Sequence, residues 1–502
     1  MNPLIQLKKA APVFLVALVC FGLLPTMQAV SPPPDGGYPR FTTAEGDNAL
    51  FSLTSGAANT AVGWFSLKSL TTGSFNTGVG AGALVLNTGD SNTATGTVAL
   101  FLNTTGARNT ANGTAALLFN STGTDNTAVG FQALNSNTTA SVNTALGSAA
   151  LFSNTTGVGN TAVGFQALAL NTTGGSNTAI GVGALFSNTT GLATAIGQGA
   201  LFSNTTGTHN TANGLNALFN NTTGNFNTAN GDGALYSNTT GSQNTANGYL
   251  ALVSNTTANF NTANGTDALE NNTGERNTAD GADALVNNTT GFDNTATGVE
   301  ALFSNTTGNF NVAFGAGAGA SATTGSNNVY IGTGMNGVAG ESNACYIASI
   351  FGQTSATGIP VLVGSDNKLG TTTSSQRFKE NIKPMDKASE ALLALRPVTF
   401  RYKKEIDPHS ISQFGLVAED VEKVNPDLIV RDKEGKPYSV RYDAVNAMLL
   451  NEFLKEHKTV EQQGQTIARL EKQLEAVTAT LQKVSARLEL NKPAPQTVLN
   501  NR

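Results

Sequence analysis

Hydrophobic and polar residues recur along most of this chain with a period of 16 or 17 residues. Each period opens with the block Asn-Thr-Ala-x-Gly, first complete at Asn59, continues with an Ala-Leu pair such as Ala133-Leu134, and reaches a turn such as Asn204-Thr205-Thr206-Gly207. Strict repetition at a short fixed period indicates stacked identical units. The pattern therefore predicts one repeat domain over residues 59–332.

A unit of 17 residues is too short for a helical hairpin and fits one coil of a β-solenoid (β-roll) with two short strands and two turns. Asn and Gly supply the positive φ angles of tight corners, Thr favours strands, and the Ala-Leu pair provides small and large inward residues. With coils about 4.8 Å apart, about seventeen of them would form a rod about 80 Å long. A disordered tract is disfavoured because leucines recur in phase from Leu84 to Leu302. We therefore expect a mainly β fold.

The variable residue of the block is Asn in four successive coils, at Asn213, Asn230, Asn247 and Asn264. Amide side chains stacked at the coil spacing can hydrogen-bond to one another, so we predict an Asn ladder at these positions. The alternative is a binding function, in which outward rows of Asn and Thr on a flat face bind a glycan or ice.

Past residue 332 the period gives way to shorter patterns. Residues 345–352 and 359–364 have the composition of strands. These two runs predict a small β collar over residues 333–373, between the repeats and the rest of the chain.

The C-terminal part has a different pattern. Residues 374–445 alternate short helical and strand-like runs, which predicts an α+β domain. From Asn446 apolar residues alternate by threes and fours as far as Leu488. More than five heptads predict a coiled coil over residues 446–490, and therefore an oligomer, with a disordered tail over 491–502.

The N-terminus has the three-part pattern of a secretory signal peptide: two lysines, an apolar run over residues 10–24, and small residues up to Ala29. We predict cleavage after Ala29, so that residues 1–29 are the signal peptide and residues 30–58 a linker. The apolar run is shorter than the about 20 residues of a spanning helix, so we expect no membrane span after signal removal. The mature protein should be secreted or displayed on a bacterial cell surface.

Charge is scarce and unevenly distributed. The net charge is −5, and 21 of the 28 Lys and Arg residues lie from Ser374 onward, so the repeats have no basic surface for nucleic acid. Loss of Cys20 with the signal would leave Cys345 alone, which excludes an intramolecular disulfide and a cysteine metal cluster. Three histidines match no metal-ligand spacing: His209, His409 and His457. We expect no metal and no other cofactor.

Ser374 and Lys379 are the candidate catalytic residues. They lie where the low-charge repeats meet the charged C-terminal domain, with the lysine five residues after the serine. A neutral, desolvated lysine amine can take the proton of a serine hydroxyl, whose oxygen can then attack a peptide carbonyl. The alternative for these two residues is a solvated, serine-rich linker.

The repeats resemble the head repeats of bacterial trimeric autotransporter adhesins over about residues 48–332. Those heads also stack short Asn/Gly/Ala coils, in a left-handed β-roll that trimerises. The coils here are longer, and we expect no membrane-anchor barrel after them. The secretion route of those adhesins is therefore not implied.

The C-terminal part resembles the intramolecular chaperone of phage endosialidase tailspikes, a self-cleaving serine peptidase family, over residues 374 to about 488. The resemblance rests on Ser-x-x-Arg-Phe-Lys-Glu-Asn-Ile at 374–382, on Arg-Pro-Val at 396–398, on Phe-Arg-Tyr at 400–402, on Phe-Gly-Leu-Val-Ala-Glu-Asp-Val at 414–421, and on Tyr442.

This resemblance implies a domain that trimerises, guides the upstream β-fibre into register, and then cuts itself off. It implies Ser374 as nucleophile, Lys379 as its base, and a scissile bond between Ser374 and Ser375. The family usually has aspartate after the nucleophile, and Ser375 departs from that.

These patterns together predict a secreted or surface-displayed homotrimeric fibre with a chaperone tail that is released by a single-turnover self-cleavage. One alternative is a repeat protein that binds a glycan or ice and keeps its tail as a permanent trimer clamp without cleavage. Another is a phage-derived tail fibre, against which the signal peptide argues. The expected partners are two further copies of the chain and, under the binding alternative, a surface ligand.

Overall fold

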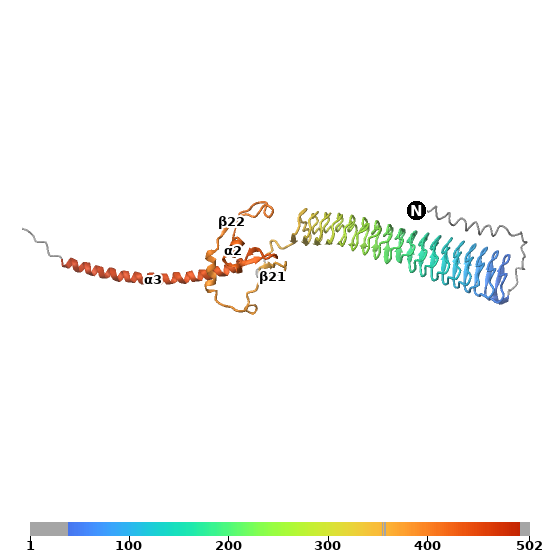
Figure 1. The fold of residues 1–502 in the computed structure, drawn as a ribbon, viewed down its shortest axis with the longest axis horizontal. Helices are drawn as coiled ribbons and strands as arrows, with labels where there is room; N and C mark the ends of the chain where they lie inside the picture. Colours follow the sequence, from blue (N-terminus) through green and yellow to red (C-terminus); the bar gives the residue numbers. More distant parts are fainter. Residues whose placement is uncertain (1–38, 354, 356–357, 492–502) are drawn as a thin grey trace, which may run out of the picture. The chain divides into compact units, whose positions relative to one another are not determined.

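The computed structural model describes residues 39–353, 355 and 358–491 (Figure 1). The chain divides into two compact units, Met1–Gln353 and Thr354–Arg502, and each is described by itself. The predicted signal peptide and residues 492–502 of the predicted tail lie outside the described residues.

The first unit is a parallel β-solenoid, as the period predicted. Its sheet has 19 strands, and each strand pairs in parallel with the next one along the chain. The strands are β1 (Thr43–Glu45), β2 (Thr60–Val62), β3 (Thr77–Val79), β4 (Thr93–Thr95), β5 (Thr110–Asn112), β6 (Thr127–Val129), β7 (Thr144–Leu146), β8 (Thr161–Val163), β9 (Thr178–Ile180), β10 (Ala193–Ile196), β11 (Asn210–Asn213), β12 (Thr228–Asn230), β13 (Thr245–Asn247), β14 (Thr262–Asn264), β15 (Thr278–Asp280), β16 (Thr295–Thr297), β17 (Val312–Phe314), β18 (Val329–Ile331) and β19 (Cys345–Ile347).

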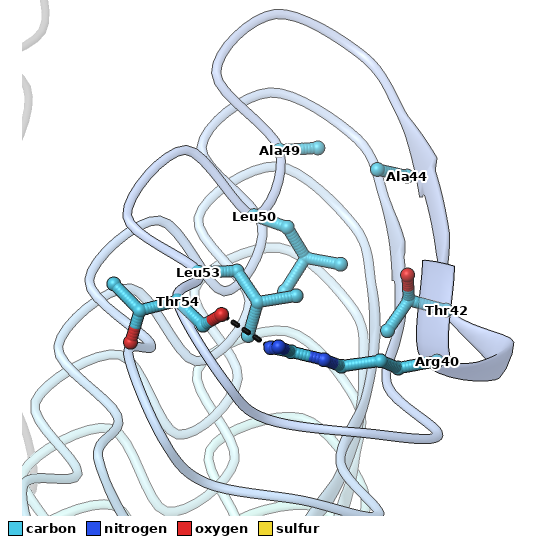
Figure 2. A pocket seen from close by; sticks show the side chains of 7 residues that line it. All are labelled: Arg40, Thr42, Ala44, Ala49, Leu50, Leu53 and Thr54. Atoms are coloured by element: carbon cyan, nitrogen blue, oxygen red, sulfur yellow. Dashed lines mark hydrogen bonds between the residues drawn. The ribbon is translucent and has the colours of Figure 1, made fainter. Parts of the chain in front are cut away.

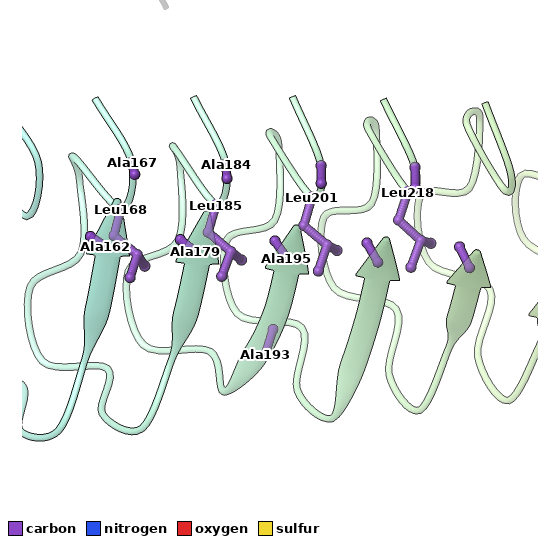
Figure 3. Close-up of a cluster of buried hydrophobic side chains, with 14 of the residues drawn as sticks. Ala162, Ala167, Leu168, Ala179, Ala184, Leu185, Ala193, Ala195, Leu201 and Leu218 are labelled. Carbon is purple, nitrogen blue, oxygen red and sulfur yellow. The ribbon is translucent and has the colours of Figure 1, made fainter. Parts of the chain in front are cut away.

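Alanine and leucine line the inside of each coil. The strand alanine and the leucine of the Ala-Leu pair face each other across the coil (Figure 3), and both Ala179 and Leu185 are fully buried. The leucine side forms no regular strand, because these leucines have a positive φ, 52° at Leu185. Its backbone still bonds to the neighbouring coil, as from Leu185 N–H to Ala200 O at 3.0 Å. Each coil therefore has one strand where the sequence predicted two.

Two rows of asparagine lie fully buried beside this core. Asn109 Oδ1 accepts the backbone N–H of Asn126 at 3.0 Å, and its Nδ2 donates to Gly123 O at 2.8 Å. Asn120 Nδ2 donates to the same carbonyl at 3.0 Å and to Asn103 Oδ1 at 2.6 Å. Because the amides satisfy one another and the turn carbonyls, the buried polar rows stabilise the stack.

The predicted outward Asn ladder is present in part. Asn230 Nδ2 donates to Asn247 Oδ1, and Asn247 Nδ2 donates to Asn264 Oδ1, both at 2.8 Å. Among the described residues, no side-chain bond joins Asn213 to Asn230. The longest ladders are the buried ones, whose asparagines the sequence analysis placed only at corners.

The sheet extends past the predicted repeat range at both ends. β1 forms a coil before residue 59, inside the predicted linker. β19 pairs with β18 through Val329 and Cys345, so residues 345–347 belong to the last coil and not to a collar. The prediction relied on the Asn-Thr-Ala block. The sheet extends further because parallel strand pairing also accepts other residues.

Near the end of the solenoid, a large residue replaces alanine on the strand and a small residue replaces leucine on the opposite side. Tyr330 stands at the strand position that alanine holds elsewhere, and Gly319 follows Leu302 in the leucine row. A Cβ on Gly319 would lie 2.7 Å from Tyr330 Cδ2. Tyr330 is fully buried and its ring stacks on Tyr346 with centroids 5.8 Å apart. The tyrosine ring fills the volume that leucine fills in other coils.

The first coil has no neighbour on its outer side among the described residues, and its core opens there into a cavity of ≈ 410 Å³ (Figure 2). The Arg40 guanidinium donates to the Thr54 carbonyl at the edge of this opening. The lining residues are Arg40, Thr42, Ala44, Ala49, Leu50, Leu53 and Thr54. The cavity is thus the uncovered end of the Ala/Leu core.

The second unit contains short elements and one long helix. They are β20 (Val361–Val363), β21 (Leu369–Thr371), η2 (Gln376–Phe378), η3 (Asp386–Ala394), β22 (Val398–Phe400), β23 (Gln413–Gly415), α2 (Ala418–Val424), η4 (Pro426–Leu428), β24 (Ile429–Arg431), β25 (Pro437–Val440) and α3 (Tyr442–Leu490). Three antiparallel pairs form, β20 with β21, β22 with β23 and β24 with β25. The buried core is small: Val421, Leu428, Ile429, Val440 and Met448.

The long helix α3 has 49 residues and covers the predicted coiled-coil segment. Its heptad side chains are exposed in the single chain, as at Ile467 and Leu474. None of the helices in the described part of the chain is long and apolar enough to cross a membrane. The predicted fold class is confirmed for the solenoid, the small antiparallel sheets and the helix, and the trimeric coiled coil stays a prediction.

Candidate functional site

The two residues of the candidate dyad lie on either side of the short helix η2, with Ser374 before it and Lys379 as its C-cap. The chain leaves β21 at Thr371, and Ser375 is the N-cap of η2, with φ −64° and ψ 133°. Phe378 N–H donates to Ser375 O at 3.1 Å, and Lys379 N–H donates to Gln376 O at 3.0 Å. One helical turn therefore separates the serine pair from the lysine.

The side chains of the dyad are not joined in the single chain. Ser374, Ser375 and Lys379 are all exposed, and no hydrogen bond links the Ser374 and Lys379 side chains in the described residues. A lysine amine acts as a base only in its neutral form, which desolvation favours. In the isolated chain both residues are in contact with water. The dry environment that their chemistry needs is therefore missing.

Two apolar residues close to Lys379 in the sequence have exposed side chains. Phe378 and Ile382 are 62% and 61% exposed. The Arg377 guanidinium lies 4.7 Å from the centre of the Phe378 ring, a cation–π contact. Both large apolar side chains therefore lie in solvent next to Lys379 in the sequence.

A different serine and lysine are in contact. Ser389 of η3 is fully buried, and Lys455 Nζ of α3 lies 3.3 Å from its Oγ. Glu452 accepts the Ser389 hydroxyl at 2.5 Å and Lys455 Nζ at 2.7 Å. The bond from Lys455, and then that from Ser389, lowers the pKa of the Glu452 carboxyl. A lysine held by a carboxylate takes no proton from serine, so this cluster fastens η3 to α3.

The Ser389 cluster was missed by the sequence analysis. Asn451, which lies 62 residues after Ser389 in the sequence, also donates a hydrogen bond from its Nδ2 to Ser389 Oγ, at 2.6 Å. The only local signal is the Glu452 and Lys455 pair at i,i+3 on the helix. Such a pair is common on exposed helix faces, so it could not have identified a buried partner in η3.

The motif pieces that the sequence analysis singled out are brought together by the fold. β22 pairs with β23, placing Thr399 opposite Phe414. The Tyr442 hydroxyl, at the start of α3, accepts the Leu416 N–H at 3.1 Å. Three stretches separated in the sequence thus form one small framework that follows the dyad. In the described residues, no group of three His, Cys, Asp or Glu side chains could hold a metal ion.

Comparison with known proteins identifies this framework in part. Neither the curated proteins nor the solved structures returned a match to the chain. The family match begins at the candidate nucleophile and ends in β24, before β25 and α3. Residues 374–430, which follow the long β-solenoid, match the model of the family described as the chaperone of endosialidase.

Proposed function

We propose that this chain is a secreted or cell-surface homotrimeric fibre protein, whose C-terminal segment directs trimer assembly and then cuts itself off between Ser374 and Ser375. The family match supports the chaperone role and self-association. The predicted signal peptide supports secretion.

The observation that carries the proposal is the exposed apolar stripe of α3. Phe453, Leu474 and Leu488 are 65%, 67% and 66% exposed. In water a long helix is stable mainly when its apolar face is packed. Apolar residues at heptad spacing bury that face by interlocking with copies of the same helix. The stripe therefore supports association of α3 with other copies of the chain.

The hairpin before the dyad has the same property. Val361, Leu362 and Val363 of β20 and Leu369 of β21 are all exposed. An isolated two-stranded hairpin with apolar residues on both faces is marginally stable in water. Three such hairpins, brought together by the helices, would cover one another and form the collar that the sequence predicted.

Assembly would also complete the catalytic environment. Covering Phe378 and Ile382 would remove water from around Lys379, which favours the neutral amine. The candidate dyad would thus become active only after the chains have associated. This order suits a chaperone, because cleavage before assembly would release the clamp too early.

The size of the ring that each possible attack would close indicates which copy of the chain supplies the nucleophile. Attack by Ser374 Oγ on its own carbonyl carbon would close a strained four-membered ring. Attack on the Thr373 carbonyl would close a five-membered ring, and it would break the bond before Ser374. A cut after Ser374 is therefore best made by the serine of a neighbouring copy in the trimer.

In that step Ser374 Oγ of one copy bonds to the carbonyl carbon of residue 374 in the next copy, and the C–N bond to Ser375 breaks. Lys379 takes the hydroxyl proton and passes it to the leaving Ser375 amine. Water then hydrolyses the ester and regenerates the serine. Atoms and charges balance with water as the only co-reactant.

The test is expression of the chain without residues 1–29, followed by light scattering, denaturing gels and intact mass. We expect a trimer and two fragments that meet between Ser374 and Ser375. Ser374→Ala and Lys379→Ala should each leave full-length trimers, whereas Lys383→Ala, an exposed lysine nearby, should be cut normally. A monomer would refute the fibre, and a full-length unmodified trimer would refute self-cleavage.

A further inference from the structure

We propose that copies of the chain contact one another along the solenoid through the outer face of its parallel sheet, and that changes of residue type along this face set their register. We call this surface the strand face; it consists of the first and third residues of each three-residue strand and their equivalents in β10 and β11. The inference rests on the proposed trimer and identifies the surface by which the repeats join it.

Strand geometry defines the strand face. The middle residue of each strand points into the core, and its neighbours point outward, because side chains alternate along a strand. In β9, for example, Ala179 is fully buried while Thr178 is half-buried and Ile180 is 40% exposed. Threonine precedes the inward residue in every strand from β1 to β16. The strand face is thus a flat surface with a regular threonine row.

The row of third residues carries blocks of apolar side chains. Leu146, Ile180 and Ile196 are 38%, 40% and 41% exposed. Apolar residues occupy this row in β2–β3, β6–β10 and β17–β19, and polar residues occupy it in β4–β5 and β11–β16. Regularly spaced, exposed Val, Leu and Ile on a flat sheet make a surface that favours burial against another protein.

The charge pattern favours a second copy as the partner. When identical chains pack in register, each residue lies close to its own counterpart, so a charged residue would meet the same charge. The third-residue row has charged side chains only at Glu45 and Asp280 in the described strands. Charged residues occur instead at positions just before the block, as in the Arg108–Asp125 and Arg276–Asp293 pairs within one chain.

The strand face is large enough to contribute a substantial part of the contact between copies. Its 19 strands, about 4.8 Å apart and each about 10 Å long, give on the order of 900 Å². A standard stable interface buries about 800 Å² on each partner. In a trimer each chain shares this face between two neighbours, about 450 Å² toward each, so the strand face supplies about half of a standard contact and the C-terminal segment must supply the rest.

Aromatic residues on the leucine side of the coils are a weaker candidate for contact. Phe186, Phe202, Phe219 and Tyr236 stack in one column, with ring centroids 4.9, 5.1 and 5.3 Å apart. Because the rings already cover each other's faces, the column offers mainly ring edges to a partner or a sugar.

Register on the strand face is specified only where the blocks change. The borders between apolar and polar residues fall between β1 and β2, β3 and β4, β5 and β6, β10 and β11, and β16 and β17. A slip of one coil would place Ile196 against Asn213 at one border and Phe314 against Thr297 at another. At all other coils the same residue types would still meet. The strand face alone therefore specifies the register of neighbouring copies only weakly. A C-terminal clamp has to bring the copies into register first, and a later slip brings unlike residues together only at the borders.

Cysteine cross-linking tests the proposal with the full mature chain, in a Ser374→Ala background that keeps the clamp attached. Cys345, the first residue of β19, lies on the strand face and is exposed. The Cys345→Ser chain has no cysteine and serves as the background. Into it we introduce one of two substitutions, Thr178→Cys on the strand face or Thr190→Cys on the turn of the same coil. Thr190 is exposed and lies outside the strand face.

A short bismaleimide should convert most Thr178→Cys chains, and chains with the natural Cys345, into covalent dimers inside the trimer. Thr190→Cys should give at least tenfold less dimer. Equal yields at positions 178 and 190 in a trimer would overturn the strand-face proposal and leave the proposed trimer intact. A monomer by light scattering before cross-linking would instead refute the proposed function.

Discussion

Asp267 is the residue whose environment fits the solenoid least well. Its Oδ1 is buried without a hydrogen-bond partner in the described part of the chain. Burial raises the pKa of the Asp267 carboxyl, and the Asp283 carboxylate in the next coil raises this pKa further. The equivalent position holds Asn216 three coils earlier and Gln166 three coils before that. An uncharged amide therefore suits this row.

We predict that Asp267→Asn raises the free energy of unfolding at pH 7 by about 1 kcal/mol, the lower end of the cost of a buried unpartnered polar atom. A raised pKa means that the folded state binds the proton more tightly, so the wild type gains stability as pH falls toward about 4 and loses it as pH rises. The difference between variant and wild type should shrink in acid, which thermal unfolding from pH 4 to pH 8 would show.

Asp232→Asn is the matched control, because Asp232 is exposed and lies two coils earlier. Its stability should change by less than about 0.5 kcal/mol at any pH in this range. An Asp267→Asn chain that is less stable than the wild type at pH 7 would show that the carboxylate has a partner that the structure lacks.

At the scale of the element, one break in the buried Asn row shows what the row does. Ala193 stands where other coils have the anchoring Asn, and β10 and β11 are each four residues long there, one more than most strands. The Ala193 N–H still donates to Asn177 Oδ1 at 2.8 Å. The anchoring position of this coil is thus bonded to the coil before it, and alanine has no side-chain group that could bond to the coil after it.

We predict that Ala193→Asn raises the free energy of unfolding by about 0.5–1.5 kcal/mol, the net value of one or two added buried hydrogen bonds. The new amide would have Gly207 O as acceptor, by analogy with Asn210 Nδ2, which donates to Gly224 O at 2.7 Å. Denaturant unfolding and hydrogen exchange in β10–β12 would measure the gain. Faster exchange in these strands would contradict the prediction.

The sequence predicted the coil, its period and its inward alanines because those features repeat in phase. It did not predict that the leucine side has no strand, since a positive φ is unusual for leucine and has no signature in composition. The predicted second strand was therefore wrong. The Ser374 and Lys379 pair was predicted from its spacing and stays a prediction, whereas the Ser389 cluster depends on contacts more than 60 residues apart that no local pattern encodes.

At the scale of the whole molecule, the proposed cleavage makes a prediction about mixed trimers. We expect a tagged Ser374→Ala chain to remain uncut when expressed alone and to be cut after residue 374 when co-expressed with the unmodified chain. The reason is that the neighbouring copy would supply the nucleophile. Mass spectrometry of the tagged fragment would identify its last residue.

A tagged chain that stays full-length in mixed trimers, while its unmodified partners are cut, would contradict attack between copies. A fragment of the unmodified chain that ends at Thr373 would indicate attack within one chain through the five-membered ring. Either result would leave the role of the C-terminal segment in assembly untouched, since that role depends on α3 and the hairpin.

The turns of the solenoid bear on how the length of such chains can change during evolution. Thr77 pairs with Thr93, one position fewer than the usual spacing, and the strand register is unchanged. Turns therefore absorb a lost residue, and each coil touches only its neighbours. Repeated coding sequence is prone to gain or lose whole units when it is copied. A chain built this way can change its length by one coil at a time, while its buried rows of alanine, leucine and asparagine remain continuous and its C-terminal segment is unchanged.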